Sequence, residues 1–362
     1  MSARAFRSGV LVALACFFAA CGSAADGPVR AAPVRPGAAP STPSSAASKA
    51  APAPARKLAP AERVPVGQIA SRLGLKLTER NDGLTVTLAG SGVRAELEGG
   101  SREIKVNGLR VFLGYPSIMV KGDLNLSRID FERCLTPLLR PGFGVWIPSR
   151  PTVVALDPGH GGHDQGTSSL EKTYALDVAK RAKKQLEAAG YEVVLTRTDD
   201  VYLELAERAE IANNRGADVF ISIHFNALPN DRKTSGVEVF TFAPQNQRST
   251  DSWSLGKSDD TEEAAAPANR YDHWSSVLAA AVQNRFVDDL KAFDLGKKIA
   301  HWGVLRMVRC PSMLVECGFL TSDVESRKIA TAAYRDDIAQ ALCDGVRDFT
   351  ATLETARKRA KR

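Results

Sequence analysis

Between residues 152 and 350 the chain alternates short aliphatic runs with longer stretches whose apolar residues recur at helical spacing. Such aliphatic runs are typical of buried strands, and the helical spacing is typical of amphipathic helices. Strands are expected at residues 153–156, 192–196, 218–223, 236–242, 303–308 and 313–316, and helices at 173–189, 203–215, 274–292 and 334–350. Alternation of strands with helices predicts an α/β fold, in which a mainly parallel sheet is flanked by helices on both faces. We expect one such domain over residues 151–353.

A shorter and less regular pattern precedes this region, over residues 62–150. Apolar residues at helical spacing predict a helix near each end, and period-two alternation predicts strands between them. Asn107-Gly108 separates two of the alternating runs, as expected for a tight hairpin turn. The helices are expected at 66–75 and 130–139, and the strands at 84–88, 103–106 and 109–113. The pattern predicts a small α+β domain.

The first 21 residues have the pattern of a secretory signal. Arg4 and Arg7 precede an apolar run, Val10 to Ala20, that is too short to span a bilayer comfortably. The small residues before Cys21 resemble a lipoprotein signal-peptidase site, so we favour lipidation at Cys21 over plain cleavage, with Cys16 as a weaker candidate. The chain is therefore expected to be exported to the periplasm or cell envelope and anchored to a membrane by lipid.

Composition and charge are uneven along the chain. Residues 22–61 are mostly Ala, Pro and Ser with scattered positive charge, which predicts an extended linker. The formal net charge is +7, but basic residues concentrate in residues 1–61 and in a basic tail, residues 354–362. The part between these ends is mildly acidic, so we predict no nucleic-acid partner. The basic ends are interpreted either as contacts to anionic polymers or lipid head groups, or as solubilising ends without a partner.

Four cysteines follow the signal, Cys134, Cys310, Cys317 and Cys343. An exported chain is able to pair its cysteines. Cys317, however, lies at the end of an apolar strand and is expected to be a small buried hydrophobe. Free thiols are the favoured expectation and a disulfide is the alternative.

A strand-to-loop transition at residues 153–164 carries the first chemical signal. The aliphatic run ends in Asp157-Pro158-Gly159-His160-Gly161-Gly162, where proline and the glycines allow a tight loop. In open α/β sheets, ligands bind at the carboxyl edge of the strands. His160 is expected at this edge, Glu171 just before the next helix, and His224 after a later aliphatic run. Two imidazoles and a carboxylate suit zinc and leave a fourth position for water.

Glu316 has the residue type and the place of a general base. It ends the aliphatic run Met313-Leu314-Val315 and is followed by Cys317-Gly318-Phe319-Leu320. A carboxylate in such an apolar strand is costly to bury without a partner. A metal-bound water would be such a partner, since the carboxylate would take its proton. Spacing alone supports metal-assisted hydrolysis and no narrower reaction.

Five segments together resemble the zinc-dependent N-acetylmuramoyl-L-alanine amidases of bacterial cell walls. They are Asp157 to Gly162, Leu195 to Arg197, Ile221 to Asn226, Gly236 to Val239 and Val315 to Leu320, and the resemblance spans residues 152 to 350. It implies one zinc ion per chain, with His160, Glu171 and His224 as ligands and Glu316 as the catalytic glutamate. The implied reaction is hydrolysis of the amide bond between muramic acid and L-alanine in peptidoglycan.

Other residues near these motifs have supporting interpretations. Asp157 is expected to hold the loop or a ligand imidazole rather than to bind the metal. Arg197 and Arg208 are expected to fix loops by ion pairs, and Glu238 to be structural. Family members often carry an Arg-Gly-Val-Lys-like run where this chain has Leu295-Gly296-Lys297-Lys298. The two lysines are therefore candidates for contact with a substrate carboxylate or phosphate.

The periodic pattern fails between residues 244 and 273, which predicts a long inserted loop. In the resembling family, some members carry an inserted segment at this place that covers the zinc and keeps the enzyme off. Under that interpretation Glu262 and Glu263 are candidates to contact the metal. A solvated insertion with no such role is the favoured alternative.

The small domain weakly resembles the N-terminal-like domain of copper amine oxidases around Val106-Asn107-Gly108, and it contains no histidine. We expect it to be a scaffold or a wall-contact module without a metal. The implied partners of the whole chain are peptidoglycan, a membrane, and a protein activator that the sequence does not name. Two alternatives stay open, a zinc peptidase of the peptidoglycan stem peptide and a non-catalytic wall-binding lipoprotein.

Overall fold

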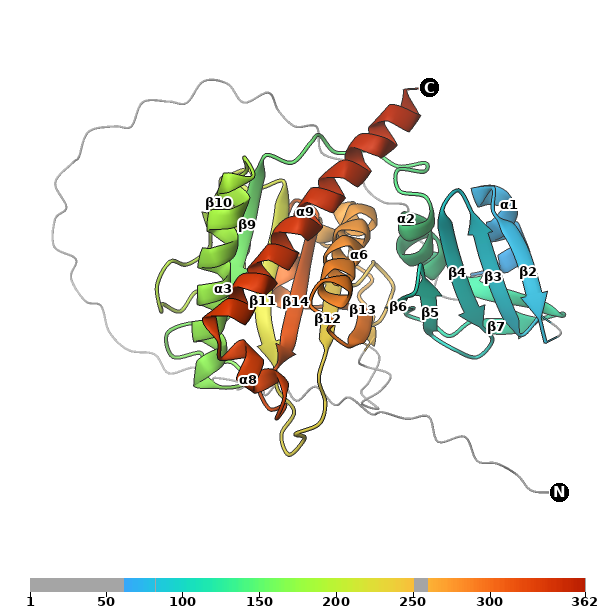
Figure 1. Cartoon of the computed structure of the whole chain (residues 1–362). Helices are drawn as coiled ribbons and strands as arrows, with labels where there is room; N and C mark the ends of the chain where they lie inside the picture. The colour runs from blue at the N-terminus through green and yellow to red at the C-terminus, as the bar shows by residue number, and fades with distance from the viewer. Residues whose placement is uncertain (1–61, 82, 251–259, 362) are drawn as a thin grey trace, which may run out of the picture.

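The computed structural model describes residues 62–361 except residues 82 and 251–259 (Figure 1). The predicted signal, the linker and the lipidation site at Cys21 lie outside the described residues. Most of the described chain forms a central sheet covered by helices, and a smaller group of strands and helices lies beside it (Figure 1).

Six strands form the sheet that was predicted for the second half of the chain. Their order across the sheet is β10-β9-β11-β14-β12-β13. The strands span β9 Val153–Pro158, β10 Glu192–Leu195, β11 Val219–Asn226, β12 Val237–Phe242, β13 Asp294–Ala300 and β14 Ser312–Phe319. Neighbours run parallel except β12 and β14, which pair antiparallel. The predicted mainly parallel α/β fold is confirmed, with one reversal of direction inside the sheet.

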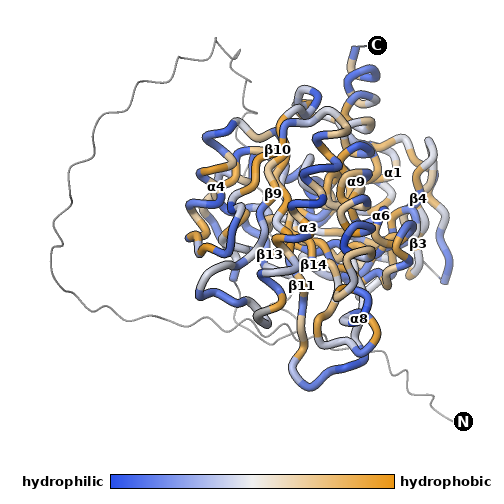
Figure 2. Tube along the Cα trace, turned by 60° about the vertical axis from the view of Figure 1, so that its left-hand side comes forward, coloured by the Kyte–Doolittle hydropathy of each residue, from blue (hydrophilic) through white to orange (hydrophobic). Residues whose placement is uncertain are grey.

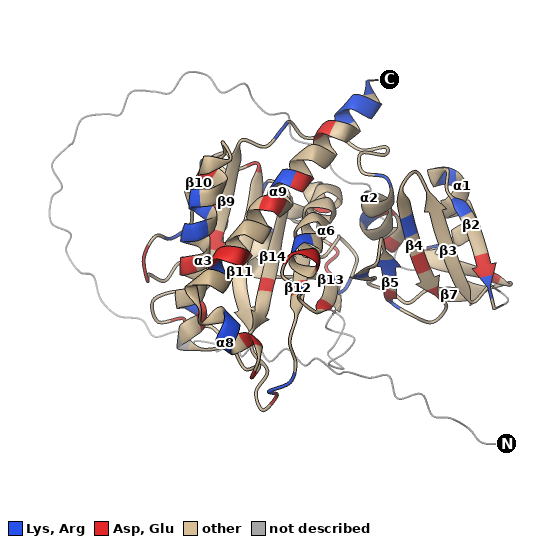
Figure 3. Ribbon diagram, viewed as in Figure 1, with Lys and Arg blue, Asp and Glu red and all other residues tan. Residues whose placement is uncertain are grey.

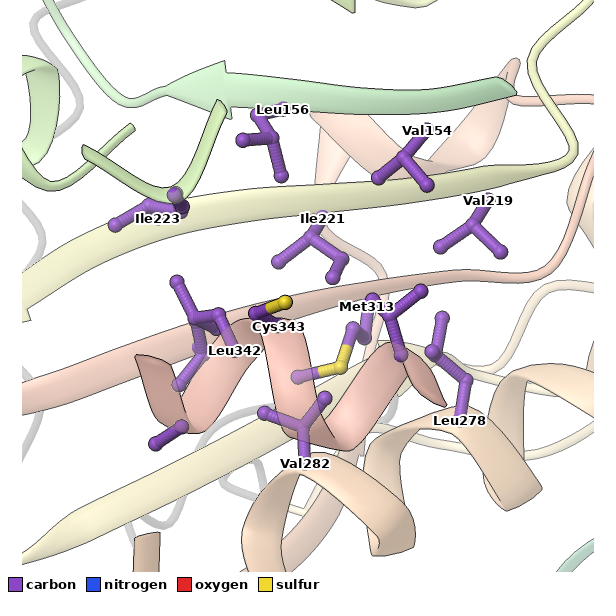
Figure 4. Close-up of a cluster of buried hydrophobic side chains, with 14 of the residues drawn as sticks. Val154, Leu156, Val219, Ile221, Ile223, Leu278, Val282, Met313, Leu342 and Cys343 are labelled. Atoms are coloured by element: carbon purple, nitrogen blue, oxygen red, sulfur yellow. The ribbon is translucent and has the colours of Figure 1, made fainter. Parts of the chain in front are cut away.

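Helices cover both faces of this sheet. On one face lie α3 (Ser169–Ala188), α6 (Asp272–Asp288) and α9 (Ala332–Ala360), and they enclose the largest apolar core. Figure 4 shows part of this core, where Leu278, Val282, Leu342 and Cys343 of the helices face aliphatic residues of β9, β11 and β14. On the other face, α4 (Leu205–Asn214) and α7 (Gly303–Arg306) cover a smaller core. Hydrophobic residues accordingly gather between the layers, and hydrophilic residues lie along the outer turns (Figure 2).

Successive side chains of each strand point to opposite faces of the sheet, so apolar and polar residues of one strand lie on different faces near its carboxyl end. Val154 and Leu156 of β9 point into the core under α3, whereas Ala155 belongs to the core on the α4 face. By the same alternation, Asp157, His224 and Glu316 lie on the α4 face, near the carboxyl ends of β9, β11 and β14. The smaller helical cover on that face leaves room for a polar site.

The predicted strand at 303–308 was wrong. Residues Gly303–Arg306 form the short helix α7, and the strand of this region is β13, Asp294–Ala300. No strand was predicted at β13, where Lys297 and Lys298 interrupt the apolar pattern. Both lysines are nevertheless buried, since acidic groups lie close enough to compensate their charges.

The last helix is longer than predicted. A helix was expected to end near residue 350, followed by a basic tail, but α9 continues to Ala360. Most of the predicted tail is therefore the exposed end of a helix.

Residues 63–139 form an α+β unit as the pattern predicted. Its elements are β1 (Arg63–Pro65), α1 (Val66–Leu73), β2 (Lys76–Arg80), β3 (Thr85–Gly90), β4 (Val93–Glu98), β5 (Glu103–Val106), β6 (Leu109–Phe112), β7 (Ile118–Val120), β8 (Asp123–Ser127), η1 (Asp130–Leu135) and α2 (Thr136–Leu139). Strand β6 pairs with β13, with Val111 opposite Lys297, so strands β2 to β6 extend the large sheet to eleven strands. Ala243 and Ile299 belong to the apolar core of this unit, which further joins the two parts of the chain.

The remaining described segments connect these layers. The insertion leads into η2 (Pro267–Tyr271), and α8 (Glu325–Ile329) precedes α9. Gln247, at the start of the insertion, is fully buried and donates a hydrogen bond to Asp130 of η1. In the described part of the chain no helix is both long enough and apolar enough to cross a bilayer. Cys134, Cys310, Cys317 and Cys343 are all buried, as the sequence predicted for Cys317.

Candidate metal and catalytic centre

The loop after β9 brings His160 to the site in an unusual backbone conformation. His160 has φ 59°, in the left-handed region that residues with a Cβ rarely adopt. Two glycines make the packing around it feasible. A Cβ on Gly159 would lie 2.3 Å from Cε1 of His224, and a Cβ on Gly166 would lie 2.3 Å from Oε2 of Glu171. The glycines of the motif therefore make room for the two other candidate ligands.

His160, Glu171 and His224 converge on one point. Nε2 of His160 lies 3.1 Å from Oε1 of Glu171, and Nδ1 of His224 lies 3.1 Å from each of these atoms. The three residues come from the loop after β9, the first turn of α3 and the end of β11. Among the described residues, these three are the group of side chains that is able to hold a metal ion.

The spacing of the three atoms fits a tetrahedral zinc site. With zinc–ligand bonds of about 2.0–2.1 Å, two ligands of a tetrahedron are about 3.3 Å apart. The observed separations of 3.1 Å are close to this edge length. Two imidazole nitrogens and one carboxylate oxygen are also the donor set that a catalytic zinc commonly has. The residues therefore fit the ion that the sequence resemblance implies.

Polar neighbours orient His160 and Glu171. Nδ1 of His160 lies 2.9 Å from Oδ2 of Asp164, which leaves Nε2 as the free nitrogen that faces the other ligands. Thr167 donates its backbone N–H and its hydroxyl to Oε2 of Glu171, at 2.6 and 2.8 Å. The second oxygen of Glu171, Oε1, is the one that faces the histidines. A carboxylate on the remote nitrogen of a ligand imidazole is a common arrangement in metal sites.

A chain of hydrogen bonds orients His224 and ends at Asp157. Nε2 of His224 lies 3.2 Å from the hydroxyl of Ser222, which donates to Oδ2 of Asp157 at 2.7 Å. Asp157 is fully buried and also accepts hydrogen bonds from Thr196 and Arg208, at 2.6 and 2.9 Å. Burial opposes its charge, but Arg208 and these hydroxyls hold the pKa of Asp157 below its ordinary value. Asp157 is placed outside the group of three ligands, in a supporting position.

Two buried arginines fix the backbone of the histidine loop. Arg208 pairs with Asp157 and donates to the carbonyls of Pro158 and His160, at 2.9 and 2.8 Å. Arg197 donates to the carbonyls of Pro158 and Gly159, at 2.9 and 2.8 Å. Arg208 thus acts partly through an ion pair, as expected, whereas these contacts of Arg197 are to carbonyl groups. The strained conformation of His160 is held by this network.

The ionisation of the three candidate ligands is strongly coupled. Burial raises the cost of charging Glu171, but the two histidines hold the pKa of its carboxyl far below the ordinary value. Burial disfavours the imidazolium form of His160, yet Glu171 and Asp164 raise its pKa above the ordinary value. Without an ion, the site therefore favours a carboxylate that shares protons with imidazoles. A divalent cation would replace those protons, because metal ligands must be deprotonated.

Glu316 lies beside this group with an unsatisfied carboxylate. It is opposite His224 in the parallel register of β11 and β14, and its side chain is 8% exposed. Its Oε2 is buried without a hydrogen-bond partner. Burial, together with the charges of Glu171 and Glu238, raises the pKa of Glu316 well above its ordinary value, while Lys298 acts in the opposite direction. Such an orphaned buried oxygen is rare and points to a partner that is absent from the polypeptide itself.

A buried ion pair lies next to Glu316. The ammonium group of Lys298 contacts Oε2 of Glu238, and Asn226 donates to Oε1 of Glu238 at 2.6 Å. The Lys298 ammonium also lies 5.8 Å from the ring centroid of Phe112, which belongs to β6 of the small unit. Lys298 therefore forms an ion pair within the protein, and Phe112 of residues 63–139 lies beside its ammonium group.

The remaining predicted site residues lie elsewhere. Lys297 is fully buried on the opposite face of the sheet, where its ammonium is 3.4 Å from the hydroxyl of Thr241, so it was wrongly assigned to substrate contact. Glu262 pairs with Arg306, and the backbone carbonyl of Glu263 accepts a hydrogen bond from Gln245 at 2.6 Å. Neither glutamate belongs to the group of three ligands.

Sequence reasoning missed several supporting residues. Asp164, Thr167 and Ser222 orient the ligands. Asp164 and Thr167 lie outside any aliphatic run, and Ser222 lies within the run of β11, where it was not assigned a role. One signal was available: Asp164 follows His160 by four residues in the same glycine-rich loop, and ligand histidines usually have such a partner. The Lys298–Glu238 pair had no local signal, because its members come from β13 and β12.

Comparison with known proteins decides the family. The sequence profile described as N-acetylmuramoyl-L-alanine amidase matches residues 154–348, which is more than half of the chain. The chain belongs to this family. The amidase is therefore a peptidoglycan hydrolase that cleaves the amide bond between N-acetylmuramic acid and L-alanine, as the resemblance implied.

Individual relatives agree with this assignment. The amidase is 33% identical to N-acetylmuramoyl-L-alanine amidase AmiA of Escherichia coli over 234 residues, which cover 58% of this chain and 80% of AmiA. It is 35% identical to LytC of Bacillus subtilis over 196 residues, which cover 53% of this chain but only 34% of LytC.

A similar solved structure is that of N-acetylmuramoyl-L-alanine amidase from Clostridium difficile 630. The two sequences are 34% identical, and the superposition covers 56% of this chain and 97% of the Clostridium difficile chain, with a TM-score of 0.44.

Proposed function

We propose that the amidase works with one zinc ion held by His160, Glu171 and His224, and that Glu316 is the general base. The observation that carries the proposal is the convergence of three ligand atoms, each 3.1 Å from the others, beside a buried carboxylate oxygen that has no partner. When bound, zinc would supply a water of lowered pKa and a positive charge to polarise the amide carbonyl.

Several residues of the chain have distinct roles in the proposed reaction. Glu316 takes a proton from the attacking water and returns it to the nitrogen of the leaving L-alanine. Oε2 of Glu316 has no other hydrogen-bond partner, so the carboxyl is available to hold the proton between the two transfers. Asp164 and the Ser222–Asp157 pair keep the two imidazoles oriented with one nitrogen toward the ion. Arg197 and Arg208 keep the loop carbonyls in place.

Replacement of the proposed base tests this assignment. Glu316→Gln preserves shape and should leave zinc content at one ion per chain, while turnover of purified peptidoglycan falls by at least about 100-fold, since general base catalysis contributes on the order of 10²–10⁴. Zinc content is measured on the purified protein, and released products are analysed by mass spectrometry. Near-normal turnover of the variant would place the base elsewhere, whereas loss of zinc would make Glu316 a ligand.

The released products also separate the alternatives. An amidase frees an intact stem peptide that begins with L-alanine and leaves the glycan strand bare. A zinc peptidase would instead leave L-alanine on the glycan, and a non-catalytic wall-binding lipoprotein would release no peptide. One digestion of purified peptidoglycan by the zinc-loaded protein distinguishes the three.

For location, we propose export with a lipid anchor. The substrate of the family is a polymer of the cell wall, which supports an exported enzyme. Residues 1–21 would be the signal, Cys21 the lipidated residue and residues 22–61 the linker. Metabolic labelling with a fatty-acid probe tests the anchor. Label should be incorporated into the wild-type chain and lost in Cys21→Ser.

The predicted roles of the small domain, the insertion and an activator remain proposals. Residues 62–150 would contact the wall or support the catalytic domain. Glu262 and Glu263 would act as inhibitory residues only after Glu262 leaves Arg306. Glu262→Gln with Glu263→Gln tests the inhibitory interpretation and spares the buried start of the insertion at Gln247. Increased basal turnover would support inhibition, and unchanged turnover would remove the idea.

A further inference from the structure

The carboxyl-terminal end of α9 carries a concentrated positive charge. Ala356 is the last buried residue of the helix, and the residues that follow it include Arg357, Lys358, Arg359 and Lys361. No described acidic residue follows Glu354, which itself pairs with Arg150. Figure 3 shows this basic end of α9 beyond the body of the molecule.

Two large aromatic side chains lie in the segment against which this helix end packs. Phe143 is 42% exposed and Trp146 is 40% exposed. A Cβ on Gly142 would lie 2.8 Å from Cβ of Ala356, so the segment and the helix are in direct contact. Arg357 further donates a hydrogen bond to the carbonyl of Pro148 at 2.9 Å. The segment that carries the aromatic residues therefore packs directly against the helix end that carries the cations.

The segment that presents the two rings is firmly attached. The indole N–H of Trp274 donates to the carbonyl of Trp146 at 2.7 Å. Val145 and Ile147, on either side of Trp146, pack against the main apolar core. The exposed rings thus project from an anchored segment. We define the basic-aromatic patch as Phe143, Trp146, Lys358, Arg359 and Lys361.

Helix stability alone does not explain this patch. Cations in the last turn of a helix interact favourably with its dipole, but the effect is confined to that turn. It gives no reason for two exposed aromatic rings beside the cations. Single exposed apolar residues are common on protein surfaces, whereas aromatic rings next to a cluster of cations without carboxylates are the combination found on membrane-surface segments.

We propose that the basic-aromatic patch docks the protein on the surface of an anionic lipid bilayer. The indole of Trp146 is suited to the head-group level, where its ring is apolar and its N–H is in contact with water. The ring of Phe143 would be buried at the acyl boundary beside it. Lysine and arginine side chains are attracted to anionic head groups. A hydrated anionic polymer would attract the cations but offers no apolar phase for Phe143 and Trp146. The two features together therefore select a bilayer as the occupant.

Sedimentation with lipid vesicles tests the proposal on the full-length chain. Vesicles of phosphatidylcholine that contain phosphatidylglycerol are compared with vesicles of phosphatidylcholine alone. The basic residues 1–61 are the same in the wild type and in every variant, so their contribution cancels when variants are compared on the same vesicles. Lys358→Gln, Arg359→Gln and Lys361→Gln are combined in one variant. Its partition onto anionic vesicles should fall by about 100-fold, since each basic residue near such a surface contributes roughly fivefold. Phe143→Ser with Trp146→Ser should lower the binding that persists at high salt.

A matched variant controls for overall charge. Lys180→Gln, Lys184→Gln and Arg327→Gln remove the same number of exposed cations from α3 and α8. The proposal predicts a much smaller loss of binding for this control. Equal losses in the two triple variants, equal binding of the wild type to both kinds of vesicle, or tighter binding to a soluble polyanion than to vesicles would each overturn it.

Discussion

Glu316 of β14 lies directly opposite Glu238 of β12, in the antiparallel pairing that interrupts the otherwise parallel strands β9 to β14. Both carboxylates are buried, and Glu238 pairs with the ammonium of Lys298 whereas Oε2 of Glu316 has no partner. The antiparallel pairing thus places the carboxylate of Glu238, which is neutralised by Lys298, next to that of Glu316, which has an oxygen without a hydrogen-bond partner. A residue that stabilises the fold and the proposed general base are therefore neighbours, and substitutions at this pair are informative about stability and about the proposed mechanism.

Loss of the Lys298 charge should destabilise the fold. Lys298→Met leaves Glu238 as an uncompensated buried carboxylate, and breaking a buried ion pair costs about 3–5 kcal/mol. We expect the free energy of unfolding, measured by urea titration, to fall by that amount. The double variant Glu238→Gln with Lys298→Met removes both charges and should recover most of the loss. If the double variant were as unstable as Lys298→Met, packing rather than charge would explain the effect.

Asp164 should control zinc affinity without being a ligand. Asp164→Asn keeps an acceptor near Nδ1 of His160 but removes the negative charge. Loss of such a supporting carboxylate typically weakens metal binding by about 10–100-fold. The dissociation constant for zinc is measured by competition with a chelating dye. Glu210→Gln, an exposed change on α4, serves as the control and should leave the affinity unchanged.

Gly166 should tolerate no side chain. A Cβ at this position would lie 2.3 Å from Oε2 of Glu171 and 2.6 Å from Cδ2 of His160. Gly166→Ala should therefore displace a ligand and abolish stoichiometric zinc binding. Gly216→Ala is the matched control, because Gly216 has a similar positive φ, 64° against 67°, but nothing within 4 Å of an added Cβ. Zinc content that is equally reduced in both variants would point to backbone strain instead of the predicted collision.

Asp272 should make stability depend on pH. Burial raises its pKa to about 7 from the ordinary value of 3.8, although Arg133 acts in the opposite direction. The unfolded chain releases this proton near pH 4 and the folded chain keeps it until near pH 7. The contribution of Asp272 to the unfolding free energy therefore falls as pH rises through this window, by about 4 kcal/mol at most.

The variant Asp272→Asn isolates this contribution. It should have a flatter dependence of unfolding free energy on pH between about 4 and 7 than the wild type. Both proteins are measured in the presence of a chelator, so that proton release on metal binding does not enter the comparison. Parallel curves for the two proteins would show that Asp272 ionises normally in the folded state.

The sequence predicted those candidate site residues that lie at the carboxyl end of a buried strand. His160, His224 and Glu316 each follow an aliphatic run, and the edge at which parallel strands end brings such residues together. The order of the strands and the reversal between β12 and β14 were not predictable in this way. An aliphatic run has the same pattern whichever direction it runs, so its partners depend on the complete fold.

The sequence also did not predict the roles of polar residues that depend on a partner far away in the chain. Lys297 and Lys298 were predicted as candidates for substrate contact, but both are buried, and an isolated lysine is costly to bury. Their compensating groups, among them Asp272 and Glu238, come from α6 and β12. A local pattern contains no information about such long-range compensation, and for the same reason β13 was predicted in the wrong place.

The pairing of β6 with β13 has a mechanical consequence. Strands β2 to β6 share hydrogen bonds with the sheet that carries Glu316, so a force applied at the outer strand β2 travels through the sheet rather than through a hinge. A ligand that binds residues 76–112 would thereby hold the candidate zinc ligands at a fixed height and angle above the surface to which that ligand belongs.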